Sequence, residues 1–276
     1  MKIKDRKLKN GEKIPEIGFG TWNLAGKTVL QSVEEALEAG YNHIDTAEGY
    51  SNESEIGEVL KNYDRSKLFL TSKVLPSNLN YENVINSCKK SLEKLNTSYL
   101  DLYLIHWPNP AISLRETLWA MNSLYEKNLV KSIGVSNFSL YQLKIAQKIS
   151  PLPLTVNQVE FHPWWNQNKL LDYCLDNDIV LTAAAPLART EVLSDKTIIQ
   201  LSTKYDKTPA QIVLKWELAK KIIPIPKSST KEHIRQNIKI YDWDMSAEDL
   251  KLIDNIGRKK QVYQLSIDDE VYGISD

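Results

Sequence analysis

Short apolar runs recur along the chain, and longer segments with helical periodicity separate them. Each run is too short for a helix and is followed by a turn, which indicates a buried β-strand. There are eight such runs, at 17–20, 41–44, 68–70, 100–105, 130–135, 154–159, 179–184 and 222–225. Because the runs are almost continuously apolar, we expect parallel strands that are covered by helices.

The segments between the runs have the apolar spacing of amphipathic helices. Val29, Val33, Ala36 and Leu37 share one helix face, and Gly40 is suited to end that helix. The same spacing recurs at Val84, Ile85, Cys88, Leu92 and Leu95. Helices are therefore expected to alternate with the strands along the chain.

Several helix starts can be predicted from capping residues. Ser113-Leu-Arg-Glu116 has the spacing of a capping box, and Thr208-Pro209 places a cap residue before a proline that suits the first turn. Two more helices are expected after the last strand, one beginning near Thr230 and one near Ser246.

Eight strand–helix units predict a closed (β/α)8 barrel. The chain has 276 residues, close to the roughly 250 that are typical of this fold, so we predict a single barrel domain over residues 1–276. A doubly wound open sheet is the alternative, but Gly18-Phe-Gly20 stops short of a G-x-G-x-x-G fingerprint. Asn10-Gly11 predicts an N-terminal hairpin that caps the barrel, and an extra helix and tail would end the chain.

The composition argues against several kinds of partner. Lys plus Arg and Asp plus Glu are both 35, so no basic excess favours nucleic acid or an anionic membrane. No segment approaches the ~18 to 20 apolar residues that cross a bilayer, and the start lacks the apolar run of a secretory signal.

Cys88 and Cys174 have no metal-ligand spacing and predict packed, reduced thiols. We expect a cytoplasmic protein without bound metal, a monomer or a weak dimer.

Polar residues stand where several of the apolar runs end. In a barrel of this kind, the chemistry is built at the carboxyl ends of the strands. The residues at these ends are Asp45, Lys73, His106, Asn157, Gln158 and Glu160, and Tyr50 follows five residues after Asp45. An acid, a base and a cation are therefore expected to meet at one mouth of the barrel.

Four of these residues together predict proton transfer, although each alone could be a helix cap, a surface lysine or a packing residue. A free phenol has a pKa of about 10, and an adjacent ammonium lowers that pKa and makes the phenol a better acid. Asp45 would keep Lys73 charged beside Tyr50. His106 could hydrogen-bond the oxygen that receives the proton.

Seven stretches of the sequence are similar to a known family. They are GFGTWN (18–23), GYNHIDTAEGYSNESEIG (40–57), LFLTSKV (68–74), DLYLIHWPNP (101–110), IGVSNF (133–138), VNQVEFHPWWNQ (156–167) and IPKSSTKEHIRQN (225–237). In order and spacing they resemble the aldo-keto reductase superfamily, from about residue 8 to about residue 245.

The resemblance implies a barrel that reduces aldehydes, ketones or sugars, reversibly, with NADP(H); NAD(H) is expected as a second cofactor because of the departure at His233 described below. It implies a catalytic tetrad of Asp45, Tyr50, Lys73 and His106, in which Tyr50 is the general acid. The implied cofactor-binding residues are Thr21, Trp22, Asp45, Ser136, Asn137, Gln158, Pro186, Leu187, Lys227, Ser228, Thr230, His233 and Asn237. The implied substrate pocket is lined by Trp22, Tyr50, His106 and Trp107.

Two positions depart from the family pattern. Ala184 stands where an aromatic residue usually stacks on the nicotinamide, so we expect a tryptophan to take its place. His233 stands where an arginine usually clamps the 2′-phosphate of NADP, and Arg235 is expected to face another way. Neutral imidazole offers one donor and no charge, so the preference for NADPH should be weak and should rise at low pH.

Two other functions remain open at this point. One is a barrel that binds a nucleotide without turnover and serves a regulatory role, which Ala184 and His233 would permit. The other is an aldolase with Lys73 as a Schiff-base lysine, which leaves Tyr50 and Gln158 unexplained. The substrate itself is not encoded in a motif, and residues 258–276 match no pattern.

Overall fold

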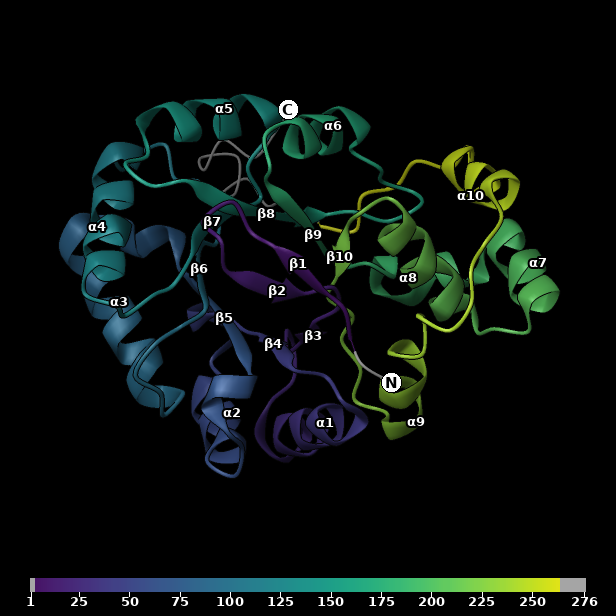
Figure 1. Ribbon diagram of the computed structural model, residues 1–276, viewed down its shortest axis with the longest axis horizontal. Coiled ribbons are helices and arrows are strands. Elements are labelled where there is room, and N and C mark those ends of the chain that lie inside the picture. The colour runs from purple at the N-terminus through teal and green to yellow at the C-terminus, as the bar shows by residue number, and fades with distance from the viewer. Residues whose placement is uncertain (1–2, 264–276) are drawn as a thin grey trace.

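The computed structural model describes residues 3–263, and it contains a barrel of parallel strands surrounded by helices (Figure 1). The barrel strands are β3 (Phe19–Gly20), β4 (His43–Asp45), β5 (Phe69–Val74), β6 (Leu102–Ile105), β7 (Ile133–Ser136), β8 (Leu154–Glu160), β9 (Val180–Ala184) and β10 (Ile223–Pro224). They pair in chain order from β3 to β10, and every pair is parallel.

Backbone hydrogen bonds join the first barrel strand to the last. The amide of Gly18 donates to the carbonyl of Pro224 at 3.0 Å, and that of Gly20 donates to Pro226 at 3.1 Å. A Cβ atom on Gly20 would lie 2.9 Å from the carbonyl oxygen of Ile225, so a glycine allows the two strands to approach. The predicted (β/α)8 barrel is confirmed.

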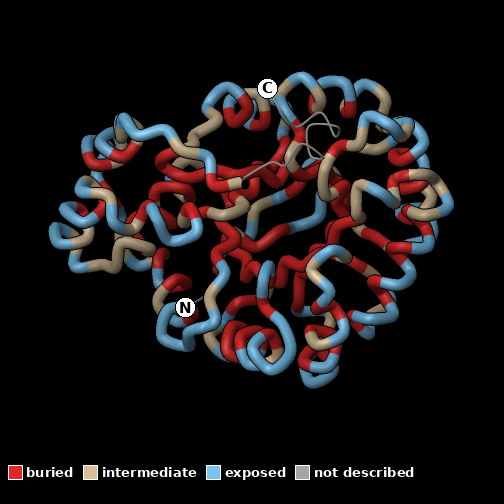
Figure 2. The backbone as a smooth tube through the Cα atoms, turned by 180° about the vertical axis from the view of Figure 1, so that it is seen from behind, coloured by how far each residue is buried: buried red, intermediate tan, exposed pale blue. Residues whose placement is uncertain are grey.

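Helices follow the strands and cover the outside of the barrel. They are α1 (Gly26–Ala39), α2 (Glu53–Leu60), α3 (Tyr81–Lys94), α4 (Leu114–Glu126), α5 (Leu140–Ile149), α6 (Asn168–Asp176), α7 (Lys196–Tyr205), α8 (Pro209–Ala219), α9 (Lys231–Asn237) and α10 (Ala247–Asp254). Short 3₁₀ segments are η1 (Glu48–Tyr50), η2 (Arg65–Lys67), η3 (Pro76–Asn78) and η4 (Ala188–Ser194). The helix faces toward the strands are buried, and the outer faces are exposed (Figure 2).

The predicted helix ends are mostly confirmed. Gly40 ends α1 with φ of 101°, a left-handed conformation that favours glycine. Thr208 opens α8 with a complete capping box, and the helices after β10 begin at Lys231 and Ala247. The helix predicted to open at Ser113 is confirmed, since Ser113 is the N-cap residue of α4, but the capping box itself is wrong: the Ser113 side chain makes no cap bond, and the Glu116 carboxylate accepts the Tyr81 amide at 2.9 Å.

An N-terminal hairpin closes one end of the barrel, as predicted. Strands β1 (Asp5–Lys7) and β2 (Lys13–Pro15) pair antiparallel on either side of the Asn10-Gly11 turn. Leu8 and Ile14 of the hairpin join the inner core cluster with Phe69, Leu102, Leu104, Val156, Val180 and Ile223. This apolar plug fills the barrel below the polar residues at the strand ends.

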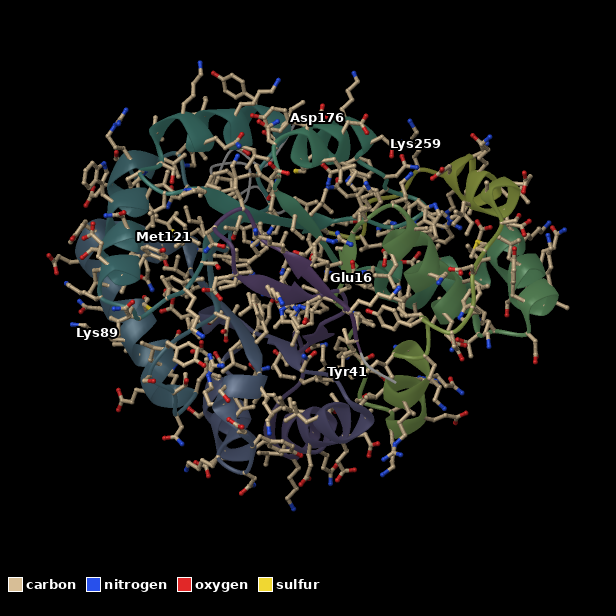
Figure 3. The ribbon with its side chains drawn as sticks, viewed as in Figure 1. Glu16, Tyr41, Lys89, Met121, Asp176 and Lys259 are labelled. Carbon is tan, nitrogen blue, oxygen red and sulfur yellow. The ribbon has the colours of Figure 1, made fainter. Side chains whose placement is uncertain are left out.

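A second and larger core lies between the strands and the helices. Tyr41 is buried there, whereas Lys89 of α3 projects from the outer rim (Figure 3). Cys88 and Cys174 are buried in this layer and unpaired, as expected. Between residues 3 and 263, no helix combines the length and apolar character that a bilayer crossing needs.

Candidate active site

The predicted ion pair between Lys73 and Asp45 lies at the open end of the barrel. Both side chains are buried, and Lys73 Nζ donates to Asp45 Oδ1 at 2.6 Å and to the Thr46 carbonyl at 2.8 Å. Adjacent parallel strands place the two residues together, since β4 ends at Asp45 and β5 carries Lys73. Burial lowers the pKa of Lys73, and the carboxylate of Asp45 counteracts that effect.

Tyr50 and His106 complete the predicted tetrad. Lys73 Nζ lies 3.4 Å from the Tyr50 hydroxyl, and the Tyr50 and His106 rings meet edge to face with centroids 5.5 Å apart. Burial first, and the charge of Lys73 second, lower the pKa of His106 to about 3. His106 is therefore neutral near pH 7, and its buried Nδ1 has no hydrogen-bond partner among residues 3–263.

The expected lowering of the Tyr50 pKa is wrong in this structure. Burial, and next the negative charge of Asp45, raise the pKa of Tyr50 well above its ordinary value. The Lys73 ammonium, which was expected to lower the Tyr50 pKa, donates a hydrogen bond to Asp45 at 2.6 Å. It lies farther from the Tyr50 hydroxyl, at 3.4 Å. Tyr50 is therefore held as a protonated phenol across the neutral range.

Glu48 fixes the short turn that carries Tyr50. Its carboxylate accepts the Leu75 amide at 3.0 Å, the Asn78 side-chain amide at 2.9 Å and the Ser87 hydroxyl at 3.0 Å. These bonds tie η1 to α3 and to the segment between β5 and α3. Sequence reasoning missed Glu48, since an acidic residue in a loop carries no distinctive spacing.

Asn52 holds the loops after β3 and β4 together. Its Nδ2 donates to the carbonyls of Thr21 and Leu24, both at 2.9 Å, and its Oδ1 accepts the Thr46 hydroxyl at 2.8 Å. Thr21 also donates its hydroxyl to the Asp45 carbonyl at 2.9 Å. Thr21 is thus a structural neighbour of Asp45, and Asn52 is a second residue that the sequence did not reveal.

Three predicted cofactor residues connect to the tetrad through hydrogen bonds. Gln158 Nε2 donates to Asp45 Oδ2 at 2.8 Å, and the Ser136 hydroxyl donates to the Gln158 carbonyl at 2.8 Å. Asn137 has φ of 62°, and its Nδ2 donates to the His106 carbonyl at 2.9 Å. The ends of β7 and β8 are therefore joined to the residues that surround Tyr50.

The tryptophans predicted to line the pocket lie at the strand ends. Trp22 is 47 % exposed, and the Arg189 guanidinium lies 4.9 Å from the centre of its ring. Trp107 is half-buried and packs against Tyr263. Trp164 is buried instead, and its indole donates to Asp195 at 3.0 Å.

The β9 end carries the remaining positions of the predicted nicotinamide site. Ala184 is the last residue of β9 and half-buried, and Pro186 and Leu187 follow it. Ala185 has φ of 47°, and Ala188 has φ of 46°. A left-handed backbone at residues other than glycine makes this an unusual segment.

The predicted phosphate site follows β10, away from the tetrad's hydrogen bonds. Lys227 is exposed and makes no ion pair within the described chain, and Thr230 donates its amide to the Ser228 hydroxyl at 3.0 Å. His233 is exposed, while Asn237 is buried on the same helix.

Arg235 faces away from the phosphate site, as expected. Its guanidinium pairs with Glu35 and, at 3.5 Å, with Glu38, both on α1. Lys231 also pairs with Glu35, at 2.6 Å. The basic residues nearest His233 in sequence are thus held by acidic partners.

Comparison with known proteins identifies the family of the chain. Residues 16–258 match the Aldo/keto reductase family. The chain belongs to this family. It is 38% identical to the glyoxal reductase of Bacillus subtilis over 93% of this chain and 94% of the relative. It is 36% identical to aldo-keto reductase family 1 member A1-A of Danio rerio, over 92% of this chain and 90% of the relative.

Solved aldo-keto reductases share the fold. MGS-M4, an aldo-keto reductase from a deep-sea metagenome library of the Medee basin, superposes with a TM-score of 0.91 and 38% identity, covering 94% of this chain and 97% of that one. A Bombyx mori aldo-keto reductase in complex with NADP gives a TM-score of 0.90 and 32% identity, with 96% of both chains covered.

The residues present suit a nicotinamide dinucleotide. Exposed Lys227, with no acidic partner in the described chain, suits a phosphate, while the amides of Asn137 and Gln158 and the Ser136 hydroxyl suit a carboxamide. Within residues 3–263, no cluster of His, Cys, Asp and Glu is arranged to hold a metal ion.

Proposed function

We propose that this chain reduces the carbonyl group of aldehydes, ketones or sugars with NADPH, and also oxidises the corresponding alcohols. The contact that carries the proposal is the Tyr50 hydroxyl at 3.4 Å from Lys73 Nζ, with His106 edge-on to the phenol. Bound NADPH supplies the hydride. We place the whole of residues 1–276 in one domain, acting in the cytoplasm on a small molecule.

Tyr50 donates its proton to the carbonyl oxygen. The phenolate that remains is stabilised by the ammonium of Lys73, which Asp45 holds in place. His106 is neutral and orients the oxygen by a hydrogen bond, so a single phenol supplies the proton. Trp22 and Trp107 line the side of the pocket away from these polar groups.

Cofactor selection depends on the phosphate site. Lys227, Ser228 and Thr230 would hold the 2′-phosphate, and Asn237 would hold the adenine. His233 would offer an imidazole N–H donor in place of the bidentate guanidinium of an arginine, so we infer that NADH is accepted as well. The Bombyx mori relative solved with NADP supports NADP(H) as the principal cofactor.

Ser136, Asn137, Gln158, Pro186 and Leu187 would hold the nicotinamide. Since Ala184 offers no aromatic face, a tryptophan would cover the ring in its place. A fluorescence titration of an Ala184→Tyr variant tests whether position 184 matters: a stacking tyrosine there would tighten cofactor binding by up to about tenfold. An unchanged affinity would show that position 184 does not matter.

The test is consumption of NADPH and of NADH with a panel of aldehydes, ketones and sugars, at pH 6 and pH 8. We expect turnover with both cofactors and a ratio of kcat/KM for NADPH over NADH that is larger at pH 6. Cofactor binding without turnover would indicate a silent nucleotide-binding barrel instead. Trapping of a substrate by borohydride on Lys73 would indicate an aldolase.

A further inference from the structure

The carboxylate of Glu160 anchors the last described residues of the chain. Glu160 ends β8, two residues after Gln158, and is 2 % exposed. Its Oε1 accepts the Val262 amide at 2.7 Å, and its Oε2 accepts the Tyr263 amide at 2.9 Å. Bonds from backbone amides to a buried carboxylate are charge-assisted and therefore strong.

A third partner completes the anchor. His162 Nε2 lies 2.8 Å from Glu160 Oε1. Both side chains are buried, so the carboxylate depends on protein donors instead of water. Without the amides of Val262 and Tyr263, one oxygen of Glu160 would lose the only partner found for it within the described residues.

Residues 258–263, which we call the strap, make further contacts with the loops at the strand ends. The Lys260 amide donates to the Trp164 carbonyl at 3.0 Å, and its ammonium pairs with Glu191 at 2.5 Å. The Arg258 guanidinium lies 3.9 Å from the centre of the Trp164 ring. Lys259, within the strap, is labelled in Figure 3.

The strap brings Tyr263 to the active site. The rings of Tyr263 and Trp107 lie with centroids 5.8 Å apart and their planes inclined by 56°. Burial, and next the neighbouring Tyr50, raise the pKa of Tyr263. An aromatic side chain from the last described residue thus packs against Trp107, a predicted wall of the pocket.

We propose that Glu160 is a positioning residue: it holds the strap so that Tyr263 and Trp107 together form an aromatic wall that favours carbonyl substrates with a flat apolar group. The proposal rests on the proposed reductase function and names its preferred substrate class. Because Glu160 binds backbone amides, the anchor does not depend on the side chain at position 262. An aldehyde too short to reach the wall gains little from it.

The test compares benzaldehyde with propanal in a Glu160→Gln variant. An amide at position 160 presents one acceptor to two backbone donors, so the strap loosens. We expect the KM for benzaldehyde to rise about 2- to 12-fold, with a smaller change for propanal. We also expect hydrogen exchange of the peptide containing 258–263 to accelerate about tenfold or more.

Two further variants keep the test decisive. Val262→Pro removes one donor and leaves the carboxylate intact, so it should raise the same KM even if Glu160→Gln does not fold. Glu126→Gln, on the exposed surface of α4, is the matched control. It should change neither the KM for benzaldehyde nor the hydrogen exchange of residues 258–263.

Two results would overturn the proposal. They are equal KM changes for both aldehydes, which would indicate general damage, and unchanged exchange of 258–263 in the variants. If the protein reduced no aldehyde at all, the proposed function would fail, whereas hydrogen exchange would still test the anchor by itself.

Discussion

Gln158 and Asp45 are joined by a hydrogen bond across the barrel, with Gln158 Nε2 donating to Asp45 Oδ2 at 2.8 Å. Their strands β8 and β4 are not neighbours in the sheet, so the bond crosses the interior. The other carboxylate oxygen of Asp45 accepts Lys73 Nζ at 2.6 Å. The carboxylate of Asp45 therefore links Lys73, which is proposed to stabilise the Tyr50 phenolate, to Gln158, which is proposed to hold the cofactor.

A Gln158→Met substitution should lower both stability and activity. It leaves one buried oxygen of Asp45 without its donor, which should cost about 1–3 kcal/mol in the free energy of unfolding, measured in urea. Gln236→Met, on α9, is the matched control, because the side chain of Gln236 donates only to Glu232 among the described residues. Equal stability in the two variants would show that the bond to Asp45 contributes nothing.

The pH profile of carbonyl reduction should lack a histidine inflection. The pKa of His106 is lowered to about 3, and that of Tyr50 is raised well above its ordinary value. The imidazole is therefore neutral and the phenol protonated from about pH 5 to pH 9, so kcat at saturating NADPH should be flat there. A change of slope near pH 6 to 7 would contradict this assignment of protonation states.

Restoring an arginine at position 233 should strengthen the preference for NADPH. Arg235 cannot substitute because it is paired with Glu35 and Glu38. A charge-assisted bond contributes about 1.5–3 kcal/mol, so His233→Arg should raise the ratio of kcat/KM for NADPH over NADH about 10- to 150-fold. No change in the ratio would place the 2′-phosphate elsewhere.

Glu217 is a buried carboxyl group whose two oxygens have no partner among the described residues. Burial raises its pKa in the folded state well above 4.5, so folding favours the protonated form. The stability that this group contributes is complete below about pH 4.5 and is lost as the pH rises toward the folded pKa, by at most about 1.4 kcal/mol per pH unit.

A Glu217→Gln variant cannot lose this contribution as the pH rises. The free energy of unfolding of the variant minus that of the parent should therefore be larger at pH 8 than at pH 5. Urea unfolding at the two pH values measures the difference. A constant difference between variant and parent at both pH values would mean that Glu217 does not titrate with folding. Glu126→Gln serves again as the exposed control.

The barrel could be predicted from sequence because its signals are local. The alternation of apolar runs with amphipathic segments fixed the strand order, and the strand ends placed Asp45 beside Lys73. The hairpin at Asn10-Gly11 and the cap at Thr208 are likewise encoded by adjacent residues. The tetrad was predicted because its members match the family's spacing, and its catalytic roles stay a prediction.

The missed features depend on partners far apart in the chain. Glu160 meets Val262 across 102 positions, and Glu116 meets Tyr81 across 35. The position of Glu160 at a strand end could be predicted, but no local pattern indicates which distant donor such a carboxylate binds. The pKa of Tyr50 was mispredicted for a related reason. It depends on the burial of the phenol by distant segments, which cannot be read from the residues around Tyr50.

The proposed role of Tyr50 is tested most directly by kcat for aldehyde reduction in Tyr50→Phe, with Tyr125→Phe on the surface of α4 as the control. Removal of the only proposed proton donor should lower kcat by about 10²- to 10⁴-fold, while the affinity for NADPH and the far-ultraviolet circular dichroism stay unchanged. A Tyr50→Phe protein that retains more than about a tenth of the parent kcat would contradict the assignment of Tyr50 as the general acid.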